Sequence, residues 1–294
     1  MPAKILDGRK ISAEIREELK ERTERLKGKG ITPGLAGILV GEDPGSTTYI
    51  NLKEKASGEV GINSQMVRLP EDIKEEELLK EIDLLNLDAK VHGIFIQLPM
   101  PGHLDENRAL TNILPDKDVD GFHPMNVGKA WMGQQAFLPA TPTGIYEMLI
   151  RSGYSDLKGK NVVIVNVDNL VGKPLASILA QEEVGANVNL VHPSTPDLGP
   201  RYTYWADIVV VSVNKAHFIT AEMVKDGVIA IDFGANYIED PSSKTGKRLV
   251  GDLDFDAIKE KAEAITPVPG GVGPMTVTML LVNTVAAAER QAGG

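Results

Sequence analysis

The chain has 294 residues, with 31 Lys and Arg against 41 Asp and Glu, which gives a formal net charge of −10 at pH 7. At about 150 residues per domain, this length favours two domains. The acidic balance argues against a nucleic-acid-binding scaffold, whose surface is basic, but it leaves an anionic small ligand open. The absence of cysteine excludes disulfides, thiolate metal sites and Cys nucleophiles, and the five histidines lack the HExxH spacing of a zinc site. No metal is therefore predicted.

The amino-terminal segment MPAKILDGRKISAEIREELK is charged and amphipathic. It has neither the apolar stretch nor the cleavage site of a signal peptide. No apolar run approaches the roughly 18 residues of a membrane-spanning helix. We therefore expect a cytoplasmic protein that does not interact with membranes.

The first part of the chain alternates helical patterns with short apolar runs. The expected helices cover residues 8–29, 46–58 and 73–85, and the expected strands cover 34–40, 64–69 and 92–98. This order is typical of βαβ units and predicts a parallel sheet. Residues 99–142 are rich in Pro, Gly and Asp, show little periodicity, and are expected to form an irregular connection of functional importance.

A second α/β block follows. Its expected strands cover residues 161–165, 187–192, 207–213, 228–233 and 264–266, and its expected helices cover 142–152, 171–183 and 276–292. The strand NVVIV followed by a turn and a helix resembles the first half of a nucleotide-binding Rossmann fold. The turn at 166–174 lacks GxGxxG. By itself, this pattern supports a doubly wound α/β domain better than a dinucleotide site.

Four side chains carry candidate chemistry, each with a plainer alternative. Tyr49 and Lys53 stand four residues apart and share one helix face, where they form either a ring-stacking and proton-transfer pair or a solvated pair. Gln97 ends an expected strand, where it either orients Lys53 or only caps the strand. Asp120 can accept two hydrogen bonds from an amino-pyrimidinone edge, but an acidic loop residue is also a common turn former. The Pro- and Gly-rich segment 267–274 is either a wall that a ligand approaches closely or a tight interdomain turn.

Several segments together resemble one family. They are YINLK at 49–53, GIFIQLPMPGH at 93–103, PDKDVDGFHPMNVGK at 115–129, TPTG at 141–144, VGKPLA at 171–176, GDLDF at 251–255 and ITPVPGGVGPMT at 265–276. The chain resembles the bifunctional methylenetetrahydrofolate dehydrogenase/methenyltetrahydrofolate cyclohydrolase family over nearly its whole length.

The resemblance implies a two-domain α/β subunit, usually a homodimer. Its folate-binding catalytic domain would comprise residues 1–141 plus a returning carboxy-terminal helix at 275–294, and its Rossmann-type NAD(P)-binding domain would comprise 142–274, with the cleft at their junction. The implied reactions oxidise 5,10-methylenetetrahydrofolate with NADP or NAD and then hydrolyse the methenyl product to 10-formyltetrahydrofolate, in one-carbon metabolism.

The resemblance also assigns residues. Lys53, Tyr49, Gln97 and Asp120 would be catalytic, with Gln97 as the partner of Lys53 and Asp120 recognising the pterin. The substrate would contact Tyr49, Gln97, Leu98, Pro99, Asp120, Pro269, Gly270 and Gly271. The cofactor would contact Asn166, Val167, Asp168, Val171, Gly172, Lys173, Pro174, His192, Ser212, Val213 and Thr276.

Two nucleotide loops depart from the family pattern. Where the family usually has Gly-Arg-Ser, this chain has Asn166-Val167-Asp168, so an anion stands where a cation for the 2′-phosphate of NADP is expected. The loop at 212–216 lacks the family's glycine. Three hypotheses follow: a bifunctional enzyme that favours NAD, a cyclohydrolase with weakened or lost oxidation, and a non-catalytic folate-binding protein. The intact Lys53, Gln97 and Asp120 set argues against the third, because binding alone does not need a proton-transferring Lys, and we adopt the first.

Overall fold

The computed structural model describes residues 2–42, 44–243 and 246–293. The chain divides into two compact units, one formed by Met1–Ser12 and Thr141–Thr276 and the other by Ala13–Ala140 and Val277–Gly294. We call them the six-stranded unit and the three-stranded unit, after their main sheets. Each is described by itself.

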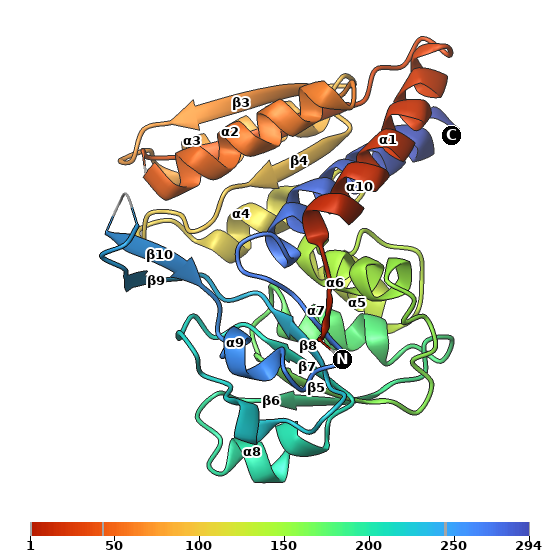
Figure 1. Ribbon diagram of the computed structural model, residues 1–294. Coiled ribbons are helices and arrows are strands. Elements are labelled where there is room, and N and C mark those ends of the chain that lie inside the picture. The colour runs from red at the N-terminus through yellow and green to blue at the C-terminus, as the bar shows by residue number, and fades with distance from the viewer. Residues whose placement is uncertain (1, 43, 244–245, 294) are drawn as a thin grey trace. The chain divides into compact units, whose positions relative to one another are not determined.

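The three-stranded unit contains a parallel sheet in the order β3-β2-β4 (Figure 1). The strands are β2 (Gly34–Val40), β3 (Asn63–Leu69) and β4 (Gly93–Ile96), and the helices between them are α2 (Pro44–Glu59) and α3 (Glu75–Leu87). The central strand β2 is buried at every position, as expected for a continuous apolar run covered on both faces. The predicted parallel sheet is confirmed. Helix α2 begins at Pro44, two residues before the expected start at 46.

The last helix, α10 (Val272–Ala292), contributes its residues from Val277 onward to the three-stranded unit. There it lies beside α1 (Gly8–Lys27), with Arg22 donating through two nitrogens to the Glu289 carboxylate (Figure 1). Asn283 donates to the carbonyl oxygens of Val119 and Leu138. The predicted return of the last helix to the first domain is therefore confirmed.

Helix α10 also satisfies a length and composition test for a membrane span, with a mean hydropathy of 1.2. Of that apolar window, 61% is buried inside the protein. Its apolar residues thus serve the protein core, as in core helices of comparable length.

The segment expected to be irregular, residues 99–142, contains two short helices, so that expectation is wrong in part. These are α4 (Glu106–Asn112) and α5 (Pro124–Trp131). The Asp105 carboxylate caps α4 by accepting from the Arg108 amide, and His123 caps α5 through the Met125 amide. Helices of 7 and 8 residues are too short to show a clear period, so their caps are the stronger signal. Helix α6 (Ala140–Arg151) follows.

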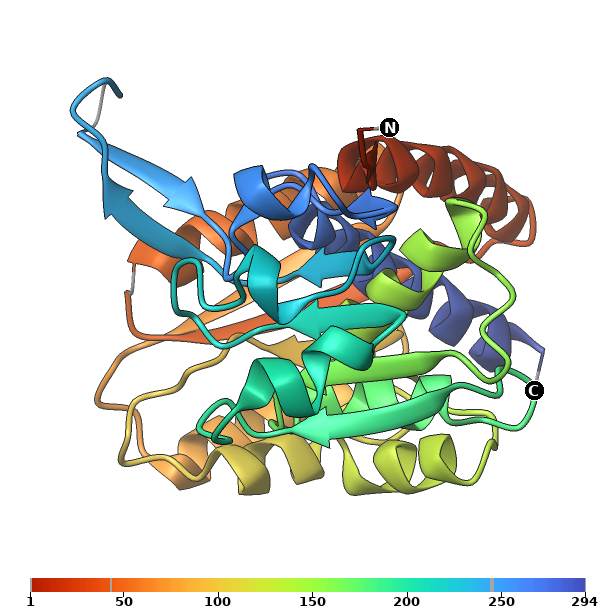
Figure 2. The ribbon, with the colours of Figure 1, turned by 60° about the horizontal axis from the view of Figure 1, so that its bottom comes forward.

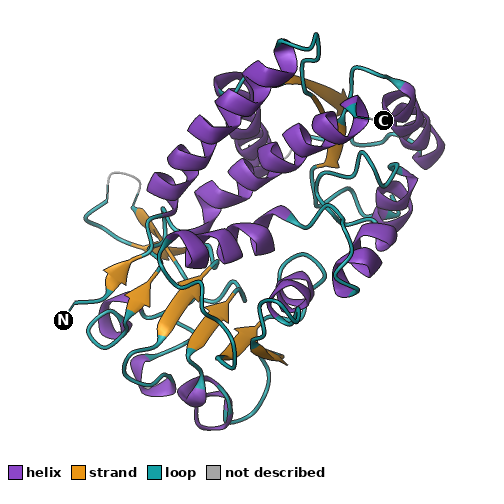
Figure 3. Cartoon of the chain, turned by 90° about the vertical axis from the view of Figure 1, so that its right-hand side faces the viewer, coloured by secondary structure: helices purple, strands orange, loops and turns teal. Residues whose placement is uncertain are grey.

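The six-stranded unit contains a parallel sheet in the order β1-β11-β8-β7-β5-β6 (Figures 2 and 3). Its strands are β1 (Lys4–Ile5), β5 (Asn161–Val165), β6 (Asn187–Val191), β7 (Ile208–Val211), β8 (Ile229–Asp232) and β11 (Ala264–Ile265). Strand β5 pairs with β6 on one side and with β7 on the other. The predicted doubly wound arrangement is confirmed, and its switch point lies at β5.

Strand β1 belongs to the six-stranded unit. The segment Met1–Ser12 clusters with the six-stranded unit, not with the domain expected over residues 1–141, because β1 pairs with β11 and the Lys4 ammonium donates to the Ser152 carbonyl. A strand of two residues carries no readable alternation, so the sequence did not reveal it.

Other elements of this unit differ from expectation in length or were not predicted. Helix α7 is Gly172–Leu179, shorter than the expected 171–183, and the sequence analysis missed the antiparallel hairpin of β9 (Asn236–Glu239) and β10 (Lys247–Val250). The hairpin extends away from the sheet of its unit (Figure 2). The remaining short helices are α8 (Leu198–Arg201), η1 (Thr203–Trp205), η2 (Ala221–Met223) and α9 (Phe255–Ile258).

Candidate active site

Lys53 is the centre of a compact side-chain cluster in the three-stranded unit. Helix α2 places Tyr49 and Lys53 on one face, and the Lys53 side chain is 7% exposed. Its Nζ donates to Gln97 Oε1 at 3.3 Å and lies 4.0 Å from the centre of the Phe95 ring and 5.5 Å from that of Tyr49. In these surroundings the Lys53 amino group loses water contacts and instead interacts with one amide oxygen and two aromatic rings.

Burial shifts the pKa values of the two titratable groups in this cluster. Loss of hydration lowers the pKa of Lys53, and the negative charge of Asp120 partly opposes that shift. Burial raises the pKa of Asp120 to about 6, against the lowering effect of Lys53 and with a further raising effect of Asp118. The acid and the base are therefore closer in pKa than in water, which suits them to proton transfer near neutral pH.

The end of β4 fixes Gln97. Its backbone amide donates to the Ile38 carbonyl, and its Nε2 donates to the Leu98 carbonyl at 2.9 Å. These bonds leave Oε1 directed at Lys53. The Leu98–Pro99 bond that follows is cis, and Pro99 is exposed. Leu98 and Pro99 thus adjoin the cluster, next to Gln97.

The loop that carries Asp120 is held together by Asp118. The buried Asp118 carboxylate accepts from the amides of Gly121, Phe122 and His123 and from the Asn126 side chain. Asp118 therefore organises the loop, while Asp120 faces Lys53 closely enough for their charges to interact. The structure brings together the four residues that the sequence analysis named catalytic.

The predicted nucleotide residues lie in the six-stranded unit, mainly where β5, β6 and β7 end. The turn after β5 is held by hydrogen bonds between its own residues and by one bond to the loop after β7. Asn166 Oδ1 accepts from the Asp168 and Gly172 amides, and its Nδ2 donates to the Ser212 carbonyl and to the Asp168 carboxylate. Asp168 Oδ1 accepts from the amides of Leu170 at 2.9 Å and Val171 at 2.7 Å.

Close packing in this turn requires glycine at position 172, and the Asp168 carboxylate is the anion within it. A Cβ on Gly172 would lie 2.3 Å from the Asn166 carbonyl oxygen. The amide of Lys173 donates to the Asp168 carbonyl. The backbone amides at the start of α7 therefore donate to groups of the same turn. Asp168 therefore places its negative charge at a helix N-terminus, where a bound phosphate would otherwise be stabilised.

The remaining predicted nucleotide residues make simple local contacts. Lys173 Nζ donates to Asn169, His192 Nδ1 pairs with the Ser194 hydroxyl at 2.6 Å, and the Thr276 and Thr141 hydroxyls lie 3.0 Å apart. Val167, Pro174, Ser212 and Val213 stand in the same turn and loop segments.

The Pro- and Gly-rich segment also lies in the six-stranded unit. Gly270 has a φ of +113°, and its carbonyl accepts from the Arg9 amide. A Cβ on Gly8 would lie 1.8 Å from the Gly271 carbonyl oxygen. Pro269, Gly270 and Gly271 thus form a close backbone wall against the start of α1 within this unit.

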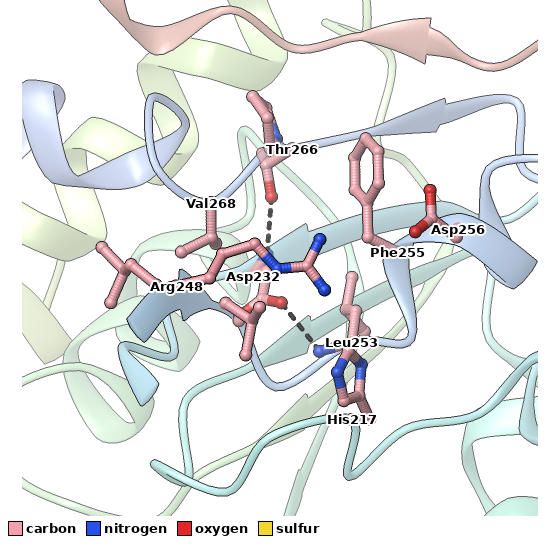
Figure 4. A pocket seen from close by; sticks show the side chains of 12 residues that line it. His217, Asp232, Arg248, Leu253, Phe255, Asp256, Thr266 and Val268 are labelled. Atoms are coloured by element: carbon pink, nitrogen blue, oxygen red, sulfur yellow. Dashed lines mark hydrogen bonds between the residues drawn. The ribbon is translucent and has the colours of Figure 1, made fainter. Parts of the chain in front are cut away.

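A cavity of about 270 Å³ lies at the ends of β8 and β11 in the same unit (Figure 4). Asp232, Thr266 and Val268 line it from the strand ends, and Arg248 and Phe255 line it from β10 and α9. The sequence analysis named neither Asp232 nor its neighbour Asp252 as a site residue, although the GDLDF motif contained Asp252. The GDLDF motif was the available signal for Asp252, but its burial and its amide partners appear only in the folded structure.

Comparison with known proteins decides the family. The model for the catalytic domain of tetrahydrofolate dehydrogenase/cyclohydrolase matches residues 6–120, and the model for its NAD(P)-binding domain matches residues 139–292. The chain belongs to the tetrahydrofolate dehydrogenase/cyclohydrolase family.

Relatives in this family match the whole chain. The "Bifunctional protein FolD" of Exiguobacterium is 49% identical over 98% of this chain and 99% of its own length. The FolD crystal structure from Campylobacter jejuni is 46% identical, covers 98% of this chain and 99% of its own, and has a TM-score of 0.93. The Trypanosoma brucei enzyme, solved with NADP and an inhibitor, is 38% identical with full coverage of both chains and a TM-score of 0.94.

Proposed function

We propose that this chain is a bifunctional enzyme that oxidises 5,10-methylenetetrahydrofolate with a nicotinamide dinucleotide and hydrolyses the methenyl product to 10-formyltetrahydrofolate. The observation that carries the proposal is the Lys53, Gln97 and Asp120 cluster, with both titrating groups shifted toward neutral pH, in a chain of this family. Relatives named bifunctional match it at about half identity over nearly its full length. The comparisons lend no support to a purely folate-binding protein or to loss of oxidation.

In the hydrolysis we propose that Lys53 moves a proton at the folate ring nitrogen. Burial favours its neutral amine, which can accept a proton from the attacking water and return one to the nitrogen as the ring opens. Gln97 orients the amine without adding a charge, so it does not stabilise the ammonium as a carboxylate would. Tyr49 offers its ring face to the flat pterin system.

We propose that Asp120 recognises the pterin. Its carboxylate, ionised above a pKa of about 6, can accept two hydrogen bonds from the amino-pyrimidinone edge. Leu98 and Pro99 follow Gln97 directly and would contact the same substrate. We assign Pro269, Gly270 and Gly271 to the substrate as well, as a backbone wall that side chains do not obstruct.

The six-stranded unit fits a nicotinamide dinucleotide. Its sheet has the Rossmann switch point at β5, and the loops after β5, β6 and β7 open at one edge, where such cofactors bind. When bound, the dinucleotide supplies the hydride acceptor. We propose that it contacts the segments 166–168 and 171–174 together with His192, Ser212, Val213 and Thr276.

We further propose that NAD is preferred over NADP. Asp168 adds a negative charge to the turn where the family usually has a cation for the 2′-phosphate, and its carboxylate is fixed there by the Leu170 and Val171 amides. Unit charges about 4 Å apart interact by on the order of 1–4 kcal/mol at exposed or partly screened sites. A ribose hydroxyl can donate to the same carboxylate, whereas a phosphate is repelled by it.

The domain roles and assembly are also proposals. We assign folate chemistry to the three-stranded unit and dinucleotide binding to the six-stranded unit, and we expect a cytoplasmic homodimer. The hairpin β9–β10 supports self-association, because it is a separate two-stranded sheet and Tyr237 on it is 73% exposed.

A steady-state assay tests the proposal. Methylenetetrahydrofolate is supplied with NAD alone or NADP alone, and methenyltetrahydrofolate hydrolysis is followed separately. We expect both reactions, with the higher kcat/KM for NAD. Activity only with NADP would defeat the Asp168 argument, and hydrolysis without reduction of either cofactor would instead support the cyclohydrolase-only hypothesis.

A further inference from the structure

The loop after β7, residues 212–216, has the shape of a glycine turn without containing glycine. Asn214 has a φ of +54° and is exposed. Asparagine is among the few residues other than glycine that enter this left-handed region readily. Asn214 therefore adopts the left-handed backbone conformation of this turn in place of a glycine. Further contacts are needed to stabilise that conformation.

Asp252 supplies that stabilisation. Its side chain is completely buried, and its carboxylate accepts from three successive backbone amides: Val213 at 2.5 Å, Asn214 at 3.1 Å and Lys215 at 2.7 Å. Successive amides that converge in this way form an anion-binding hollow. Here a carboxylate of the same chain fills it, and Asn236 Nδ2 adds a fourth hydrogen bond at 2.8 Å.

Asp232 in turn holds the backbone around Asp252. Its carboxylate accepts from the Asp252 amide at 3.0 Å. It also accepts from the Leu253 amide at 2.7 Å (Figure 4). The two carboxylates also require glycine beside them. A Cβ on Gly251 would lie 1.9 Å from Asp232 Oδ2, and one on Gly234 would lie 2.2 Å from the Asp252 carboxyl carbon. The end of β8 is thus linked through Asp252 to the loop after β7.

Both carboxylates are ordered by amide donors. Burial raises the pKa of Asp232 to about 6, while the amides of Asp252, Leu253 and Gly234 oppose that rise. At neutral pH Asp232 is therefore ionised and can accept from all three. Charge-assisted bonds of this kind are stronger than neutral ones.

We propose that Asp252 is the positioning residue of the nucleotide loop at 212–216, with Asp232 holding it in place. The proposal rests on the proposed function, since it concerns how that loop meets the dinucleotide. The amides of residues 213–215 donate to Asp252, so they are not available to bind a phosphate. The loop would therefore contact the cofactor through the side chains of Ser212 and Val213 and through carbonyl oxygens. Asp252 itself acts only through the loop.

The first test replaces Asp252 by Asn, which has nearly the same shape but turns an NH₂ group toward amide donors. We expect the KM for NAD to rise about tenfold or more, with a smaller change in kcat. Methenyltetrahydrofolate hydrolysis, which uses no nucleotide, reports on folding of the chain. Asp254→Asn is the matched control, since Asp254 caps α9 from the same segment but does not touch the loop.

A second pair of variants changes Asn214, whose side chain is exposed, so that folding of the chain is not at risk. Asn214→Ala places an unfavourable residue in the left-handed region, whereas Asn214→Gly suits it. We expect the KM for NAD to be about fivefold higher with Ala than with Gly, which corresponds to the roughly 1 kcal/mol cost of that conformation. In Asp252→Asn, adding Asn214→Gly should recover part of the lost affinity.

The outcomes separate the two proposals. An unchanged KM in Asp252→Asn, or equal KM values for Asn214→Ala and Asn214→Gly, overturns the positioning role while oxidation by the parent enzyme still stands. Loss of hydrolysis together with oxidation in Asp252→Asn, with normal behaviour of both Asn214 variants, assigns Asp252 to general folding and also overturns it. Absence of oxidation in the parent enzyme refutes the proposed function itself.

Discussion

The Lys53 cluster and the nucleotide loops use charged side chains differently. In the Lys53 cluster, burial lowers the pKa of Lys53 and raises that of Asp120, which suits both groups to the proton transfer and substrate binding that we propose for them. The carboxylates of Asp168 and Asp252 instead accept hydrogen bonds from backbone amides of the loops around them.

The contrast indicates where substitutions are tolerated in such an enzyme. A residue that donates or accepts a proton must keep its chemical type, which is the role that we propose for Lys53. A loop that presents its backbone needs only a shape, and Asn214 with Asp252 can produce the shape that glycine gives elsewhere. The predictions below address this contrast and the stability of the fold.

A large effect on both reactions is expected for Asp120→Asn. Loss of two charge-assisted hydrogen bonds should lower kcat/KM about 100-fold or more for both oxidation and hydrolysis, because both reactions bind the same pterin. In the parent enzyme folate binding should also weaken as pH falls through about 6, where Asp120 takes up a proton. Asp116→Asn, an exposed change in the same loop, is the control. A selective loss of one activity would contradict the assignment.

Gln97→Glu is expected to act on hydrolysis through charge. A carboxylate next to Lys53 stabilises the ammonium and raises its pKa, so the neutral amine forms only at higher pH. The pH–rate profile for hydrolysis should move to higher pH, with a loss of about tenfold at neutral pH. Gln97→Met, which removes the hydrogen bond without adding charge, should not shift the profile upward. An unmoved profile in Gln97→Glu would count against Lys53 as the titrating base.

Asp168→Asn should change cofactor choice by about five- to tenfold. Removing the charge while keeping the size relieves repulsion of the 2′-phosphate, so the ratio of kcat/KM for NADP to that for NAD should rise. The gain should shrink at high salt, because screening weakens the repulsion in the parent enzyme. Asp226→Asn makes the same change in net charge at a side chain that is 88% exposed, and it should leave the ratio unaltered. An equal ratio in both variants would remove Asp168 from specificity.

The smallest effect concerns stability and pH. Burial, and secondarily the charge of Lys117, lowers the pKa of His92, whose Nδ1 accepts from the Gly34 amide. The unfolded chain therefore takes up this proton first, and stability should fall as pH drops below about 6.5. Asp232 contributes with the opposite sign, since its raised pKa costs stability as pH rises through about 6. His92→Asn should show a shallower loss of Tm from pH 7 to pH 5 than the parent.

The sequence was sufficient for the larger architecture because it contains long periodic signals. The apolar run of β2 and the strand–turn–helix at β5 predicted parallel sheets, and the structure has them. Helices α4 and α5 and strand β1 were missed because each is too short for a period to emerge. Pairing of β1 with β11, 260 residues away in the chain, depends on tertiary structure alone.

The candidate site was predictable to a similar degree. Residue type and spacing pointed to Lys53 and Tyr49, and strand position pointed to Gln97. The Asp232–Asp252 link could not be predicted, because it depends on which amides a loop presents after folding. Asp168 was predicted as an anion in the cofactor turn, and only the structure shows that its carboxylate accepts from the Leu170 and Val171 amides of that turn.

Hydrolysis of methenyltetrahydrofolate by Lys53→Met, without cofactor and with folate binding measured on the same sample, tests the central claim most directly. Methionine fills the buried space but cannot carry a proton. We predict that hydrolysis falls by about 10²–10⁴-fold, the usual contribution of general acid–base catalysis, while folate still binds. Hydrolysis at the parent rate would contradict the role of Lys53 and, with it, the proposed division of chemistry between the two units.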